Sequence, residues 1–238
     1  MYTPFMTNKL VVMLALALVG LAGIAQATIV TYHNEAAFLA NLPGPSTTQD
    51  FEGLPPGSII PQGANIDGIT YDYEPFFGDI MMVTDRYETT SGDNSLGLNN
   101  FGDSFWSGNR LNLHFDAPVN AVGLYVIASE WAMDDTIHLV TDVGTVGNNG
   151  AGSVQLPDGG TAYYLGLTST EAFSSAAIEF PNFFGPTYSS APKSYVDSVE
   201  NFFRVDDITT AEVPEPATLT LLGLGLLGLA RRRRVETH

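Results

Sequence analysis

Alternation of apolar and polar residues is the main pattern between residues 28 and 211 of this 238-residue chain. Leu111, Leu113 and Phe115 alternate with polar residues, which is the period of a β-strand with one buried and one hydrated face. Turn residues separate many such segments, so the pattern predicts an all-β fold, an antiparallel β-sandwich or jelly roll. The expected strands are residues 47–52, 68–74, 80–85, 95–98, 110–116, 119–129, 136–143, 153–156, 162–168, 174–180 and 203–209.

One short helix is expected before these strands. Asn34 can cap its first turn, and Glu35 suits the positive end of the helix dipole. Apolar residues within 36–42 supply a side to bury, and Pro43 helps to end the helix.

The N-terminal residues 1–27 read as a secretory signal peptide. Lys9 precedes an apolar run, 10–25, which leads into the triplet Ala25-Gln26-Ala27. A positive start, an apolar stretch and an A-x-A triplet are the three parts of such a signal. We expect signal peptidase to cut after Ala27; a retained membrane anchor is the alternative.

The C-terminal residues 212–238 combine prolines, an apolar run of 14 residues and an arginine cluster. A comfortable transmembrane helix needs about 20 residues. Arginines hold a chain end on the cytoplasmic side of a membrane. The pattern predicts a weak, temporary stop in the inner membrane, with residues 28–211 outside; a permanent anchor without processing is the alternative. The residues concerned are Val213, Pro214, Glu215 and Pro216, then 217–230, then Arg231, Arg232, Arg233 and Arg234.

This tail resembles the PEP-CTERM sorting domain, also catalogued as the ice-binding protein C-terminal domain. The resemblance rests on the Pro-Glu-Pro triplet, the Gly- and Leu-rich run and the arginines, within residues 212–234. It implies processing near Pro214–Pro216 by an exosortase, a membrane cysteine peptidase. It also implies a bacterium that makes an exopolysaccharide or biofilm matrix. The ice-binding label does not extend to residues 28–211.

The middle of the chain, about residues 49–209, resembles the galactose-binding-like jelly rolls found in exported proteins with such tails. The resemblance implies a β-sandwich domain between the two terminal signals. It is carried by Asp50-Phe51-Glu52-Gly53, Ser95-Leu96-Gly97-Leu98, Pro118-Val119-Asn120-Ala121-Val122-Gly123 and Val205-Asp206-Asp207-Ile208.

Residues 28–211 carry 23 acidic and four basic side chains, a net charge of −19. Such a surface repels phosphate backbones, which argues against nucleic acid as a partner. The chain has no cysteine, so it has no disulfide, thiol catalysis or Cys-based metal site.

Glu52, Asp93, Asp206 and Asp207 are candidate ligands of a structural Ca²⁺, which takes six to eight oxygen ligands. The first and last strands of jelly rolls are often neighbours, which would bring Glu52 near the Asp pair. Strand alternation would turn only one of these two aspartates toward the ion. Ordinary solvated carboxylates are the alternative interpretation.

Trp106, Trp131, Tyr71 and Tyr73 are candidate contacts for a polysaccharide. An aromatic face can cover the C–H face of a sugar ring while nearby amides and carboxylates bind its hydroxyls. Trp106 stands in a polar segment, whereas Tyr71 and Tyr73 share a strand face. Packing in the core is the alternative for each of them.

No catalytic residue is assigned. Ser104 after Gly102-Asp103, and His138 three residues after Asp135, imitate parts of a serine hydrolase. Only 34 residues separate Ser104 from His138, too few for the α/β fold of those enzymes. In a strand, positions i and i+3 would also face opposite ways, whereas a triad must converge.

The sequence therefore predicts an exported, exosortase-processed protein of the cell surface or extracellular matrix, which passes the inner membrane transiently. Its middle is expected to be a non-catalytic binding module for exopolysaccharide or envelope components. A secreted polysaccharide-active hydrolase or esterase is one alternative, although no spacing singles out a pair of carboxylates. A purely structural coat or biofilm-matrix component is the other.

Overall fold

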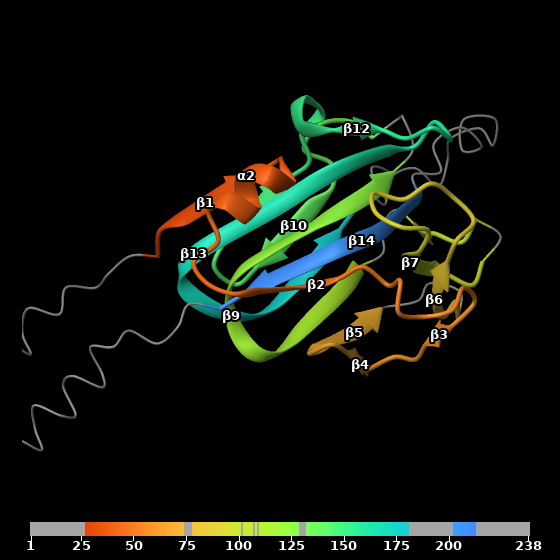
Figure 1. The fold of residues 1–238 in the computed structure, drawn as a ribbon, viewed down its shortest axis with the longest axis horizontal. Coiled ribbons are helices and arrows are strands. Elements are labelled where there is room, and N and C mark those ends of the chain that lie inside the picture. The colour runs from red at the N-terminus through yellow and green to blue at the C-terminus, as the bar shows by residue number, and fades with distance from the viewer. Residues whose placement is uncertain are drawn as a thin grey trace, which may run out of the picture.

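The computed structural model describes residues 27–73, 78–100, 102–106, 108, 110–128, 132–180 and 202–212. Antiparallel strands dominate it, together with one short α-helix, so the predicted fold class is confirmed (Figure 1). In chain order the elements are β1 (Ile29–Tyr32), α2 (Glu35–Ala40), β2 (Ser46–Gln49), β3 (Ile59–Ile60), β4 (Ala64–Ile66), β5 (Ile69–Tyr73), β6 (Met81–Thr84), β7 (Ser95–Leu98), β8 (Phe105–Trp106), β9 (Arg110–Ala128), β10 (His138–Thr141), β11 (Thr145–Gly147), the 3₁₀ turn η1 (Gly150–Gly152), β12 (Val154–Gln155), β13 (Thr161–Glu179) and β14 (Phe202–Ala211).

Two strands of 19 residues each, β9 and β13, pair with each other through the whole molecule. Thr161 faces Ala128 at one end of the pair, and Glu179 faces Arg110 at the other. The ladder is irregular only between Thr168 and Ser175, and there the pair curls over, as Figure 1 shows at the left. The sequence predicts two strands in each of these regions. The structure joins them because the chain crosses the bend without leaving the ladder.

This long pair forms the middle of both layers of the sandwich. In one layer, β1 flanks the first half of β13, β14 flanks the second half of β9, and β14 leads on to β7, β6 and β3. In the other layer, β10 flanks the second half of β13 and β5 flanks the first half of β9. The two layers are therefore parts of one folded-over sheet.

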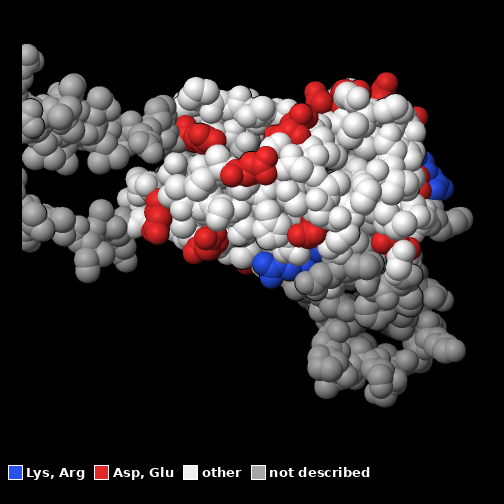
Figure 2. All heavy atoms as spheres, turned by 90° about the horizontal axis from the view of Figure 1, so that it is seen from below, with Lys and Arg blue, Asp and Glu red and all other residues white. Residues whose placement is uncertain are grey.

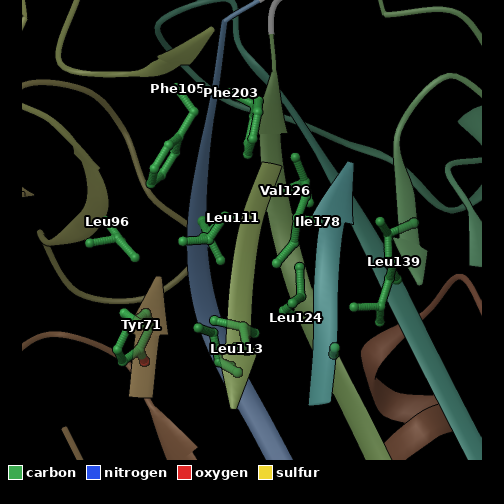
Figure 3. Packing of buried hydrophobic residues seen from close by; sticks show 14 of the residues in the cluster. Tyr71, Leu96, Phe105, Leu111, Leu113, Leu124, Val126, Leu139, Ile178 and Phe203 are labelled. Carbon is green, nitrogen blue, oxygen red and sulfur yellow. The ribbon is translucent and has the colours of Figure 1, made fainter. Parts of the chain in front are cut away.

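The main core lies between the layers. Leu111 and Leu113 of β9 are fully buried, as the alternation predicts. His114, which follows Leu113, is exposed. In Figure 3 Leu111 and Leu113 lie close to Leu124 and Val126 from the other half of the same strand. The bend thus lets one strand bury apolar side chains from both layers in the same core.

Helix α2 covers the outer face of the first layer. Asn34 Oδ1 accepts the N–H of Ala37 at 3.0 Å, which confirms the predicted cap. Phe38 is the one buried residue of this helix, and its ring packs on that of Tyr164. The predicted apolar side is wider than the buried one, since Leu39 is 42% exposed.

A pair of glycines makes room for this helix. Gly123 and Gly166 lie directly opposite each other on β9 and β13. A Cβ atom on either glycine would come within 2.9 Å of the Phe38 ring. The absence of side chains at these two positions therefore lets Phe38 and Tyr164 pack closely onto the sheet.

Gly123→Ala should lower the free energy of unfolding by about 1–3 kcal/mol, because overpacked sites force neighbours out of place. The new methyl group would overlap the Tyr164 hydroxyl and the Phe38 ring. Urea unfolding measures the change. Gly53→Ala is the matched control, since nothing lies within 4 Å of its added Cβ, and it should leave stability nearly unchanged. Equal effects of the two substitutions would contradict this account.

Candidate functional site

Both ends of the described chain lie at one end of the sandwich, which we call the tail pole. Across the first layer, Val30, Thr168, Ala121, Ala211 and Ser46 pair in turn, each with the next, and so form a single row. In this row β1 and β14 are three strand spacings apart, about 14 Å. Figure 1 shows this pole at the left, where β1 starts and β14 ends. Whatever follows β14 therefore leaves from the same end as whatever precedes β1.

The opposite end, the loop pole, is where β9 ends at Ala128 and β13 and β14 begin. The loop after β6 reaches the turn after β12 there, since Glu88 donates its N–H to Asp158 at 3.1 Å. The loop before β10 is tied to β13, because the Tyr163 hydroxyl donates to the Ala132 carbonyl. Loops from distant parts of the sequence are thus collected at the pole farthest from the tail.

Trp106 lies at the loop pole. Strand β8 pairs with the start of β14, where Trp106 is opposite Phe202. The two rings meet edge to face with their centroids 5.1 Å apart. The indole packs on one side against the main core and stays half-buried, so part of it remains accessible.

The loop before Trp106 is held by its own polar groups. Asn100 Oδ1 accepts the N–H groups of Gly102 and Ser104, and its Nδ2 donates to the Ser104 carbonyl at 2.8 Å. Asp103 lies 3.7 Å from the Arg86 guanidinium. These side chains hold the conformation of the loop that precedes the tryptophan, and so they help to fix the position of the indole.

The tyrosine candidates are corrected by the structure. Tyr71 is 0% and Tyr73 2% exposed, because both lie on the inner face of β5. Their rings are part of the core and are not available to a sugar. Trp131 lies outside the described residues.

The terminal signals also fall outside the described residues, apart from Ala27 at the proposed signal cleavage site and Glu212. Among the helices that are described, none has the length and apolar character needed to cross a membrane.

Glu52 and the last strand meet through a shared loop, residues 85–94, which follows β6. Glu52 Oε1 accepts the N–H groups of Asp93 at 2.9 Å and Asn94 at 2.7 Å. From the other side, Asp206 Oδ2 accepts the N–H of Thr90 at 3.1 Å. Glu52 and Asp206 thus hold the same loop at different residues.

Asp206 and Asp207 point to the same side, which corrects the prediction from strand alternation. The register of β14 shifts between Asp206 and Thr209, and Asp207 has a φ of 51°. This irregularity turns both carboxyl groups toward Thr90. A bulge of this kind re-aims a side chain that a regular strand would point away.

One hydroxyl group, that of Thr90, lies between two carboxyl groups in this cluster. Thr90 Oγ1 lies 2.8 Å from Asp206 Oδ2 and 2.9 Å from Asp207 Oδ2. A hydroxyl donates only one hydrogen bond. Both contacts are hydrogen bonds when Asp206 is protonated and donates to Thr90, which donates to Asp207. Burial, and next the charge of Asp207, raise the pKa of Asp206 to about 7, in keeping with this arrangement.

The cluster does not fit the predicted calcium site. Ca²⁺ needs carboxylate and carbonyl oxygens that converge on one point. Here N–H and O–H groups of the loop approach the oxygens of Glu52, Asp206 and Asp207, and Asp93 contributes its N–H to Glu52. Throughout the described ranges, no three acidic or histidine side chains form a group suited to a metal. The carboxyl groups instead act as acceptors that hold the loop.

The same loop covers a buried cation. Arg204 of β14 is 5% exposed, and its guanidinium lies 4.5 Å from the centre of the Tyr87 ring. Burial lowers the pKa of Arg204, and the charge of Asp158 opposes this effect. Tyr87 belongs to residues 85–94, so the carboxyl groups that hold the loop also keep this cover in place.

Ser104, Asp135 and His138, which match parts of a serine hydrolase in sequence, do not come together as a catalytic triad. Ser104 is buried and donates its hydroxyl to the Gly102 carbonyl at 2.8 Å. His138 does contact Asp135 at 3.2 Å, contrary to the argument from alternation, because Asp135 lies in the turn before β10 with a φ of 58°. Ser104 stands beside β14 in one layer and His138 beside β13 in the other, so base and nucleophile are separated.

Comparison with known proteins identifies the tail. The family model described as the PEP-CTERM protein-sorting motif matches residues 212–234. No curated protein matches the chain. Solved structures that resemble it include a family 29 carbohydrate-binding module, with a TM-score of 0.28 and 7% identity, covering 74% of this chain and 98% of that one. A mutant of the module CBM29-2 gives a TM-score of 0.26 at 6% identity, over 65% of this chain and 90% of that one. Similarity at this level says nothing about what this chain binds.

Stability should fall as the pH rises through the titration of Asp206. Its pKa is about 7 in the folded protein and 3.8 as a free side chain, so the protonated form is favoured by folding. The contribution is fully present below about pH 4 and is lost as the pH rises to about 7; it amounts to at most about 4 kcal/mol. Melting temperatures between pH 4 and 8 measure it. Asp206→Asn should show a flatter profile, and an identical profile would contradict the assignment.

Glu52→Ala should lower the free energy of unfolding by about 1–3 kcal/mol, because the N–H of buried Asn94 and that of Asp93 lose their acceptor. Glu52→Gln keeps one oxygen acceptor and should lose less. Thermal melts compare the three proteins. Neither Ca²⁺ nor a chelator should move the wild-type melting temperature, and a rise with Ca²⁺ that Glu52→Gln abolishes would show that the site holds the ion.

Proposed function

We propose that this protein is an exported, non-catalytic binding module whose loop pole contacts a neutral polysaccharide outside the cell. The sorting motif at residues 212–234 implies export to the cell surface or beyond. The observation that carries the proposal is that Trp106, half-buried and with part of its side chain accessible, lies at the pole opposite the tail. A protein held at its tail pole would offer this end to its surroundings.

The chemistry of the loop pole favours a sugar. The accessible part of the half-buried indole, supported by an edge-to-face contact with Phe202, offers an apolar surface to the C–H face of a pyranose. The charge of −19 over residues 28–211 disfavours an anionic polymer. Acidic side chains are spread over the face in Figure 2, where basic ones are few. A neutral glycan is therefore the ligand class that we propose.

The competing functions make different demands on the same surface. A hydrolase needs acid and base groups in reach of one bond. In the part of the chain that the structure describes, the Ser104 hydroxyl is engaged with Gly102, and Asp206 and Asp207 are buried beneath a loop. A purely structural coat component would need neither a sugar contact nor turnover. Binding to a protein of the envelope would use the same pole without an affinity for glycans.

Trp106→Ala should weaken glycan binding by about 1–3 kcal/mol, or roughly 5-fold to 150-fold, because the sugar ring loses the aromatic face on which it stacks. An array of neutral and anionic glycans, followed by calorimetry on the best ligand, measures this with the exported protein. Trp106→Phe keeps an aromatic face and should retain part of the affinity.

Leu39→Ala on α2 is the control, because Leu39 is also a partly exposed apolar side chain but lies away from the loop pole. It should bind as the wild type does. Hydrolysis of the bound glycan would support an enzyme, and the absence of any glycan ligand would support the coat. Equal affinity of the wild type and Trp106→Ala would place the binding surface elsewhere.

A further inference from the structure

The last residues of β14 are paired on both sides. On one side Thr209, Thr210 and Ala211 face β9, and on the other side residues 208–211 face β2. Ala211 is only 2% exposed. Strand order therefore persists to the residue immediately before the sorting motif, which begins at Glu212.

Strand β2 is a short edge strand that pairs with this part of β14. Among the described strands it pairs with β14 alone, over four residues, and Ser46, Thr47 and Thr48 are exposed. Its firm end is Gln49, which donates to Asp67 at 2.6 Å and accepts the N–H of Phe51. At the other end, opposite Ala211, no side-chain hydrogen bond to another described residue holds Ser46. An edge strand of this kind can be peeled from its unanchored end.

The motif leaves no spacer between the sheet and the processing site. Pro214 is three residues beyond Ala211, and three extended residues span at most about 10 Å. A hollow of about 400 Å³ lies at this point, lined by Pro45, Ser46, Thr47, Thr210, Ala211 and Glu212. A second chain can approach here from the β2 side, whereas β9 closes the other side.

We infer that the exosortase gains its substrate by displacing β2 and pairing with residues 208–212 of β14 in its place. An extended peptide is commonly recognised by addition to a strand edge, through main-chain hydrogen bonds. Only Glu212 and Val213 lie between the paired strand and Pro214, so an enzyme that needs more of the upstream chain must take it from the sheet. The folded sandwich thereby restrains the processing of its own tail. This inference rests on the sorting motif and is independent of the proposed glycan.

A disulfide between β2 and β14 tests the inference. Thr48 and Thr209 face each other with their hydroxyl oxygens 2.7 Å apart, so Thr48→Cys with Thr209→Cys places two sulfurs within reach of a bond. The chain has no other cysteine. Pulse-labelled cells that make the exosortase, followed by intact-mass measurement of the full-length protein, give the rate of tail processing. The locked protein should be processed about tenfold more slowly, and reduction should restore the rate.

The matched control locks the other edge of the same row. Val30→Cys with Thr168→Cys joins β1 to β13 and should leave the rate unchanged. A flexible insertion of about six residues between Ala211 and Glu212 should restore processing in the Thr48–Thr209 locked protein, because it frees about 20 Å of chain. Processing of that locked protein at the wild-type rate would overturn the inference, as would a wild-type tail that stays uncut. Equal slowing by both locks would also overturn it.

Discussion

The pairing of β9 with β13 is the interaction on which the rest of the structure depends. The two strands pair from Thr161–Ala128 to Glu179–Arg110, and their register shifts only at the bend where the sheet folds over. Because each strand belongs to both layers, the layers cannot slide apart without breaking this ladder. The bend also defines one end of the sandwich, and the row from Val30 to Ser46 lies beside it. The separation of tail pole and loop pole follows from this single folded pair.

The fold class and many strand positions could be predicted because alternation is a local signal. Leu111, Leu113 and Phe115 are buried as their spacing indicates. The sequence predicts one strand over residues 110–116 and another over 119–129, whereas the structure carries β9 through the residues between them and around the bend. Whether the chain forms two strands or one depends on its pairing with β13, and a local sequence pattern carries no information about that pairing. The same limit applies to Tyr71 and Tyr73, whose shared face was evident but whose orientation toward the core was not.

The candidate site was predicted in part. The tail motif could be identified from its sequence alone because its three features follow each other directly. The sequence suggests that Glu52 lies near the last strand, but it does not show that Glu52 accepts the N–H groups of the loop before β7. The irregular backbone at Asp207 brings two carboxyl groups to one hydroxyl, and neither the bulge nor this shared contact can be read from the positions of the acidic residues in the sequence. The acidic side chains at the surface thus set the net charge, whereas Glu52, Asp206 and Asp207 hold a loop in place.

The direction of β14 has a mechanical consequence. This strand starts at the loop pole and ends at the sorting motif, so a pull between a bound partner and an anchored tail acts along its length. Hydrogen bonds between antiparallel strands lie perpendicular to that direction. The pull therefore shears the ladders with β9 and β2, and many bonds resist it together. A pull perpendicular to the strand would instead load the same hydrogen bonds one at a time, and they would break in sequence at a lower force.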